Sequence, residues 1–171
     1  MRIRRAVTKI GMTFCLTVAT SLWAVGTSEA AQPGSADLTA ANQHCSVVLD
    51  GSAPRCFATL EQADEYAGAA SVWAVRFYDW VNYNSAGATY DVYVSRDCTA
   101  TLGDKDFRFA SMPSGWNDRV SSVSTQTGAH CDVWFSSDIN YQGECGDQWI
   151  HKHWDLTQVG CFNRASSFEL S

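Results

Sequence analysis

An internal repeat limits the possible folds of this chain more than any other feature of its sequence. Residues 75–85 read Val-Arg-Phe-Tyr-Asp-Trp-Val-Asn-Tyr-Asn-Ser, and residues 133–143 read Val-Trp-Phe-Ser-Ser-Asp-Ile-Asn-Tyr-Gln-Gly. Both copies contain Val-x-Phe and, after a gap, Asn-Tyr. Self-similarity of this kind indicates two copies of one supersecondary unit. The aromatic and β-branched residues predict that each copy begins with a β-strand.

A second shared element follows each copy of the repeat. Residues 116–122 read Trp-Asn-Asp-Arg-Val-Ser-Ser, and residues 162–168 read Phe-Asn-Arg-Ala-Ser-Ser-Phe. Asn and Asp tolerate left-handed backbone and bond their own backbone, so we expect a tight turn here. The carboxylate, carbonyl and hydroxyl oxygens of such a turn are ligands for a hard cation. The alternative is that Ser121 and Ser166 only hold down the folded hairpin of their own unit.

These two elements together resemble the βγ-crystallin family. That family combines (Asn/Asp)-(Asn/Asp)-x-x-(Ser/Thr)-Ser with an aromatic strand and a folded hairpin that has Phe or Tyr two residues before Gly. The resemblance covers roughly 100 residues and implies an all-β sandwich of two Greek keys, 72–126 and 131–171 within a 72–171 domain. The second copy keeps Gly143, whereas the first has Ser85 at that position. We therefore expect Gly87 to supply the positive φ of the first hairpin.

The resemblance also implies calcium as a possible cofactor, because family members bind it between the two keys. One site would use Asn117, Asp118, the Arg119 carbonyl oxygen and the Ser121 hydroxyl. The other would use Asn163, the Arg164 carbonyl oxygen and Ser166, with Phe162 in place of the first Asn or Asp.

The first 30 residues read as a signal peptide. They combine a basic start (Arg2, Arg4, Arg5, Lys9), an apolar run over residues 10–25 and the small residues Ser28 and Ala30. The apolar run is short for a membrane span. We predict cleavage after Ala30 and a secreted protein.

The charge of the remaining 141 residues restricts the partners. Removing four basic residues and Glu29 from the 12 basic and 18 acidic residues leaves eight against 17. An acidic surface makes nucleic acid and anionic membranes poor partners. A cation or a basic protein surface fits better, and the length suits one domain with a core.

Six cysteines remain after cleavage, which for an exported protein predicts three disulfides. Sequence alone allows 15 pairings, and without a Cys-x-x-Cys spacing a zinc site is not expected. We expect Cys45–Cys56 to close a small loop. The repeat favours pairing the remaining cysteines between neighbouring strands or loops, as Cys98–Cys131 and Cys145–Cys161.

The segment before the repeat divides into two parts. Residues 31–43 have no apolar period and predict a flexible N-terminus. Residues 44–71 predict a small disulfide hairpin with a turn at Asp50-Gly51, followed by a short helix. Thr59-Leu60-Glu61-Gln62 is a capping-box pattern at the start of that helix. We assign this module no chemistry.

No catalytic motif is present, so we do not expect an enzyme. His151 and His153 would share one strand face and could bind a transition metal, but an exposed polar face is the preferred interpretation. Trp80 lies in an expected loop, where it could anchor a partner or pack locally.

The function follows from family resemblance rather than from a readable site. An actinobacterial family of metalloproteinase inhibitors matches this chain in size, export, cysteine use and fold, and it implies a secreted peptidase inhibitor acting on a secreted protease as a monomer. The inhibitory loop would lie in residues 142–147 and contain Glu144, Cys145 and Gly146; residues 102–115 are the other candidate. The alternatives are a calcium-binding structural or stress protein and a killer-toxin-like protein.

Overall fold

The computed structural model describes residues 43–49, 53–67, 71–113, 115–126 and 131–171. All of them belong to one compact unit, Pro33–Ser171. The predicted signal peptide, nearly all of the predicted flexible N-terminus and the Asp50-Gly51 turn lie outside the described residues. Within the described part, no helix has the length and apolar character needed to cross a membrane.

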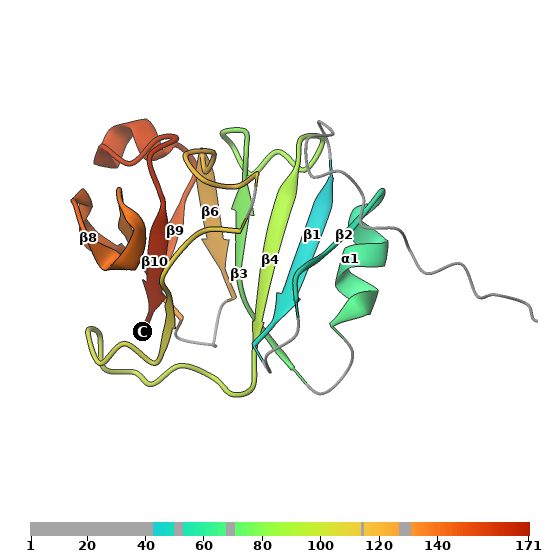
Figure 1. Cartoon of the computed structure of the whole chain (residues 1–171), viewed down its shortest axis with the longest axis horizontal. Helices are drawn as coiled ribbons and strands as arrows, with labels where there is room; N and C mark the ends of the chain where they lie inside the picture. The colour runs from blue at the N-terminus through green and yellow to red at the C-terminus, as the bar shows by residue number, and fades with distance from the viewer. Residues whose placement is uncertain (1–42, 50–52, 68–70, 114, 127–130) are drawn as a thin grey trace, which may run out of the picture. The chain divides into compact units, whose positions relative to one another are not determined.

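The described residues form two β-sheets. Figure 1 labels most of their strands. The six-stranded sheet has the order β2 (Arg55–Phe57), β1 (His44–Val48), β4 (Thr89–Val94), β3 (Val72–Tyr78), β6 (Ser122–Thr125) and β9 (Lys152–His153). The four-stranded sheet has the order β5 (Phe107–Phe109), β10 (Ser167–Leu170), β7 (Val133–Ser136) and β8 (Cys145–Ile150). One α-helix and two short 3-10 helices, η1 (Ile139–Tyr141) and η2 (Leu156–Val159), complete the described elements. The all-β prediction is confirmed.

Each repeat contributes four strands, and the third strand of each joins the sheet of the other repeat. In the first repeat β5 leaves β3, β4 and β6 and pairs with β10. In the second repeat β9 leaves β7, β8 and β10 and pairs with β6. Two Greek keys packed face to face were expected, but the structure interlocks them by exchanging one strand each. Neither key can therefore complete its sheet without the other.

The core between the sheets contains three fully buried phenylalanines. Phe77 comes from β3, whereas Phe135 and Phe168 come from β7 and β10. The Phe77 ring centroid lies 5.4 Å from that of Phe135 and 4.9 Å from that of Phe168. Phe77 and Phe135 are the phenylalanines of the two repeated Val-x-Phe segments, so the repeat places equivalent rings against each other.

Strand β4 was expected to bury every second side chain, but all six of its residues are buried. Tyr90, Val92 and Val94 are buried as predicted, but Asp91 and Tyr93 are buried as well. Helix α1 (Leu60–Tyr66) covers this second face, and its Asp64 accepts a hydrogen bond of 3.3 Å from the Tyr93 hydroxyl. A strand covered on both faces does not need polar residues at alternate positions.

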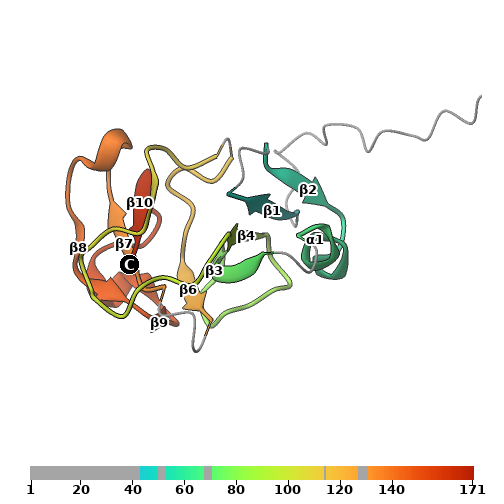
Figure 2. The ribbon, with the colours of Figure 1, turned by 90° about the horizontal axis from the view of Figure 1, so that it is seen from below.

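The predicted hairpin and helix before the repeat are confirmed. Strands β1 and β2 are antiparallel, and α1 begins after Thr59, whose side chain accepts a hydrogen bond from the Gln62 N–H. The sequence did not predict that β1 pairs in parallel with β4 and so extends the six-stranded sheet. Figure 2 shows α1 and this hairpin beside β4.

Three disulfides join Cys45 to Cys56, Cys98 to Cys131 and Cys145 to Cys161, which are the expected pairs. The second one links the two repeats, and the third lies within the second repeat. Such bonds persist in oxidising compartments and are rare in the cytosol. The structure therefore suits an extracellular or otherwise oxidising environment.

Candidate cation site

The second serine of each Ser-Ser pair holds its own folded hairpin in place. The Ser122 hydroxyl donates to the Trp80 carbonyl oxygen at 2.7 Å and accepts from the Tyr83 N–H at 3.2 Å. Ser167 makes the equivalent two bonds in the second repeat, at 2.6 and 3.0 Å. The alternative to cation binding was that Ser121 and Ser166 hold these hairpins. In the structure the serine one position later in each pair has that role.

The folded hairpins obtain their positive φ angles from the Asn-Tyr pair of each repeat. Residues 82–83 have φ values of 61° and 56°, and residues 140–141 have 57° and 63°. Gly143 is also left-handed, with a φ of 70°, but Gly87 is not, so the prediction for Gly87 is wrong. The reason for a glycine at position 87 is instead the lack of room for a side chain, because a Cβ there would collide with Asp79 Oδ1.

The first serine of the first pair lies between two oxygen atoms of different segments. Ser121 Oγ is 2.8 Å from the Asp79 carbonyl oxygen and 2.9 Å from Asn163 Oδ1. A hydroxyl has one proton, so it can donate to only one of these two acceptors at a time. Three oxygens thus converge with a single proton among them. We refer to Ser121 Oγ, the Asp79 carbonyl oxygen and Asn163 Oδ1 as the oxygen cluster.

The second pair makes the reciprocal contact, which is longer. Ser166 Oγ lies 3.4 Å from Asp118 Oδ1. Backbone hydrogen bonds also join the two motifs. The Asp118 N–H donates to the Ala165 carbonyl oxygen at 3.0 Å, and the Asn163 N–H donates to the Val120 carbonyl oxygen at 2.9 Å. Each motif therefore presents its Asp or Asn side chain to the serine of the other motif.

The structure groups the expected ligands differently from the sequence. Asn117, Asp118 and Ser121 were expected in one site, but Asp118 faces Ser166, and its other carboxylate oxygen accepts from Asn117 Nδ2 at 2.7 Å. Asn163 faces Ser121. The physical reason is that Asp118 and Asn163 adopt left-handed φ values of 55° and 49°, and the two turns are bonded to each other rather than each to itself.

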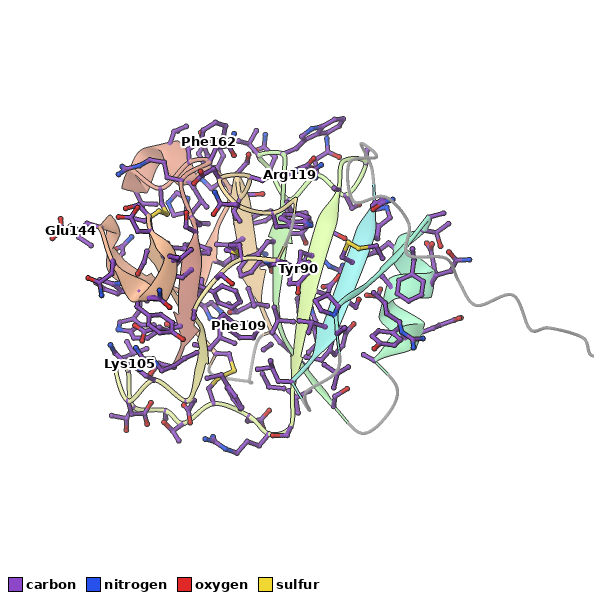
Figure 3. All side chains as sticks on the ribbon, in the orientation of Figure 1. Tyr90, Lys105, Phe109, Arg119, Glu144 and Phe162 are labelled. Carbon is purple, nitrogen blue, oxygen red and sulfur yellow. A yellow bond between two sulfur atoms is a disulfide. The ribbon has the colours of Figure 1, made fainter. Side chains whose placement is uncertain are left out.

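Asp79 and Arg119 give the oxygen cluster its charged surroundings. Asp79 Oδ2 accepts from Arg119 Nη2 at 2.8 Å, and Asp79 Oδ1 is buried without a hydrogen-bond partner in the described part of the chain. Figure 3 shows Arg119 and Phe162 at the same end of the strands. The all-oxygen donor set and the unpartnered carboxylate oxygen both fit a hard cation such as calcium.

The arginine of each motif has a second, purely local role. Arg119 Nη1 donates to the Gly115 carbonyl oxygen at 3.3 Å, and Arg164 Nη1 donates to the Gly160 carbonyl oxygen at 2.8 Å. Both glycines are left-handed, with φ values of 82° and 73°. The spacing Gly-x-x-(Asp/Asn)-Arg occurs in both copies, so a longer comparison of the repeats could have revealed these two arginines. No such signal pointed to Asp79.

His151 and His153, which were expected to share one strand face, bond to different partners. His151 Nδ1 lies 3.0 Å from Asp132 Oδ1 and 2.9 Å from Thr125 Oγ1. His153 Nδ1 accepts from the Asp155 N–H at 3.3 Å. Among the described residues, no three His, Cys, Asp or Glu side chains form a group that could hold a metal ion. A cation would thus depend mainly on neutral oxygens.

The expected inhibitory loop is shorter than residues 142–147. Strand β8 begins at Cys145, so Cys145 and Gly146 lie in a strand, and Cys145 is buried in its disulfide. Glu144 is exposed and projects from the outer edge in Figure 3. In the other candidate, residues 102–115, strand β5 is paired with β10.

No family model matches the chain, and no curated protein shows significant similarity to it. Among solved structures, the chain is similar to one described as the crystal structure of a betagamma-crystallin from an Archaea, with 22% identity and a TM-score of 0.40. That similarity covers 58% of this chain and 99% of the archaeal one.

Proposed function

We propose that this chain is a secreted calcium-binding structural protein of βγ-crystallin type. In this proposal calcium binds at the oxygen cluster and joins the two repeats. The convergence of three oxygens around one serine proton carries the proposal, because a cation would replace the missing hydrogen bond with attraction to all three oxygens.

The bound ion would stabilise the tertiary structure rather than take part in a reaction. Ser121 and Asp79 belong to the first repeat and Asn163 to the second, so an ion shared by them resists separation of the interlocked keys. Few charged ligands imply weak binding, with a Kd of about 10⁻⁴ to 10⁻³ M as in extracellular calcium modules. Such an affinity suits a calcium-rich exterior.

Thermal unfolding with and without calcium tests the proposal. Calcium at 100 times its Kd should stabilise the native state by about 2.7 kcal/mol and raise the Tm accordingly. Ser121→Ala should remove this rise. Ser122→Ala is the matched control, because its hydroxyl bonds the hairpin and not the oxygen cluster; its Tm should be lower, but calcium should still raise it. A wild-type Tm that about 100 mM calcium leaves unchanged, at least 100 times the expected Kd, would mean that the Asn163 amide simply hydrogen-bonds Ser121.

Inhibition of a secreted metalloproteinase is a second proposal, favoured by the surroundings of Glu144. Gly143 and Gly146 on either side have φ values of 70° and 89°, Arg164 Nη2 donates to the Glu144 carbonyl oxygen at 3.3 Å, and Cys145 is tied to Cys161. A short exposed turn held in this way would enter a cleft with little loss of entropy.

Titration of a thermolysin-type protease, with and without added calcium, tests this second proposal. Glu144→Ala should weaken inhibition without changing the Tm, whereas Asp147→Ala, an exposed carboxylate three residues away in β8, should not. Absence of inhibition across a panel of metalloproteinases would end this proposal and leave the calcium proposal untouched.

A further inference from the structure

The guanidinium of Arg119 is held beside the oxygen cluster by three contacts. It donates to Asp79 Oδ2 at 2.8 Å and to the Gly115 carbonyl oxygen at 3.3 Å, and it lies 5.2 Å from the centre of the Trp116 ring. The Arg119 and Asp79 side chains are 27% and 12% exposed. A pair this sheltered from solvent is screened less by water and salt than a surface pair.

Asp79 connects this ion pair to the oxygen cluster. Its carbonyl oxygen accepts from Ser121, and its carboxylate binds Arg119. Because both groups belong to one residue, the guanidinium lies within about 8 Å of the cluster. Arg119 therefore places a positive charge close to where a cation would bind and neutralises the carboxylate of Asp79.

The second repeat provides an internal comparison. Arg164 makes the same bond to its glycine, at 2.8 Å to the Gly160 carbonyl oxygen, but its other nitrogen donates to the Glu144 carbonyl oxygen at 3.3 Å. The bonds of the Arg164 guanidinium in the described part of the chain are to carbonyl oxygens and not to a carboxylate. The residue equivalent to Asp79 in the second repeat is Ser137. The two arginines thus match in position and local bonding and differ in their charged partner.

We infer that Arg119 lowers the calcium affinity of the oxygen cluster by neutralising Asp79 and repelling the ion. The inference rests on the proposed calcium-binding function. Loss of the guanidinium frees the Asp79 carboxylate, whose Oδ1 already lacks a hydrogen-bond partner in the described part of the chain. The charge at the site then becomes more negative by one unit. For a divalent ion about 8 Å away, this change corresponds to at least about fivefold tighter binding, the value that the dielectric constant of water gives.

Calorimetric calcium titration of the full, disulfide-bonded chain at low ionic strength tests the inference. Arg119→Gln should bind calcium at least about fivefold more tightly than the wild type. Arg164→Gln removes the same charge at the equivalent position and should retain the wild-type affinity. If Arg119→Gln does not fold, Arg119→Met keeps a long side chain without the charge beside Trp116 and should show the same gain. Adding Ser121→Ala to either Arg119 variant should abolish the gain.

The outcomes separate the inference from the function on which it rests. Calcium binding with equal affinity by the wild type and the Arg119 variants would overturn the inference and leave the calcium site in place. An equal gain in Arg164→Gln would also overturn it, because net charge alone would then explain the effect. No binding by any variant at about 10 mM calcium, beyond the range of such sites, would overturn the proposed function itself.

Discussion

Ser121 and Asn163 are 42 residues apart in sequence, yet the Ser121 hydroxyl lies 2.9 Å from Asn163 Oδ1. One residue belongs to the first Ser-Ser motif and the other to the second. A ligand set assembled along a single motif is therefore incomplete in this fold. The two motifs complete each other, as their strands do.

Asn163→Ala should remove the calcium-dependent rise in Tm that we assign to the oxygen cluster. Asp118→Ala should leave this rise in place, because Asp118 faces Ser166 instead of Ser121. Calorimetric unfolding of both variants with and without calcium checks the pair. The reverse result, with Asp118 required and Asn163 dispensable, would contradict the crossed arrangement.

Ser122→Ala should lower the free energy of unfolding by about 2 kcal/mol. The change removes the hydroxyl that bonds both the Tyr83 N–H and the Trp80 carbonyl oxygen in a partly buried hairpin, and each lost hydrogen bond costs about 1 kcal/mol. Ser167→Ala should have a similar effect, since its bonds are equivalent. Urea unfolding measures both, with Ser124→Ala as the control on the partly exposed side of β6. A loss no larger than that of the control would mean that the hairpin does not depend on this hydroxyl.

Gly87→Ala should destabilise the protein by about 1–3 kcal/mol through crowding. The added Cβ would lie 2.3 Å from Asp79 Oδ1 and 3.0 Å from the Trp80 ring. Gly103→Ala is the control without crowding, because nothing lies within 4 Å of its added Cβ. Its φ of 95° is unfavourable for alanine, so any loss of stability there comes from backbone strain alone. Because the Asp79 side chain must move in Gly87→Ala, this variant alone should also change the calcium affinity. Equal calcium affinity in the two variants would argue against a role for Asp79.

The stability of the protein should carry a pH dependence from Asp91. Burial raises the pKa of Asp91 to about 6, although Arg76 Nε lies 2.7 Å away and favours the charged form. A carboxyl with a raised pKa in the native state stabilises the fold at low pH. That contribution is complete below its unfolded pKa of about 3.9 and is lost as the pH rises through about 6. The total is on the order of 3 kcal/mol.

Asp91→Asn isolates this contribution, because the amide does not titrate. The difference in unfolding free energy, wild type minus Asp91→Asn, should decrease between about pH 4 and pH 7.5. Hydrogen bonds from Thr99 and Thr157 help to lower the pKa values of Asp106 and Asp155, which gives an opposite pH dependence. This dependence is the same in both proteins and cancels in the difference. A difference independent of pH would show that Asp91 stays charged throughout this range.

The sequence by itself determined the features that depend on short spacings. Period-two aromatic and β-branched residues predicted the strands, because alternate side chains of a strand share one face. Thr59 predicted the start of α1, because its side chain reaches an N–H three residues later. The repeat predicted two equivalent units and favoured the pairs Cys98–Cys131 and Cys145–Cys161, which the structure contains.

Only the tertiary structure decided how the two units combine. The motifs specify the same local turn twice, so they cannot show that Ser121 faces Asn163 while Asp118 faces Ser166. Likewise, no pattern in the sequence indicates that β5 and β9 exchange sheets. The charge beside the oxygen cluster has the same origin, because Asp79 and Arg119 are 40 residues apart and meet only when β3 and β6 pair. Local spacing sets the conformation of each turn, but the packing of one repeat against the other selects the partner of each side chain.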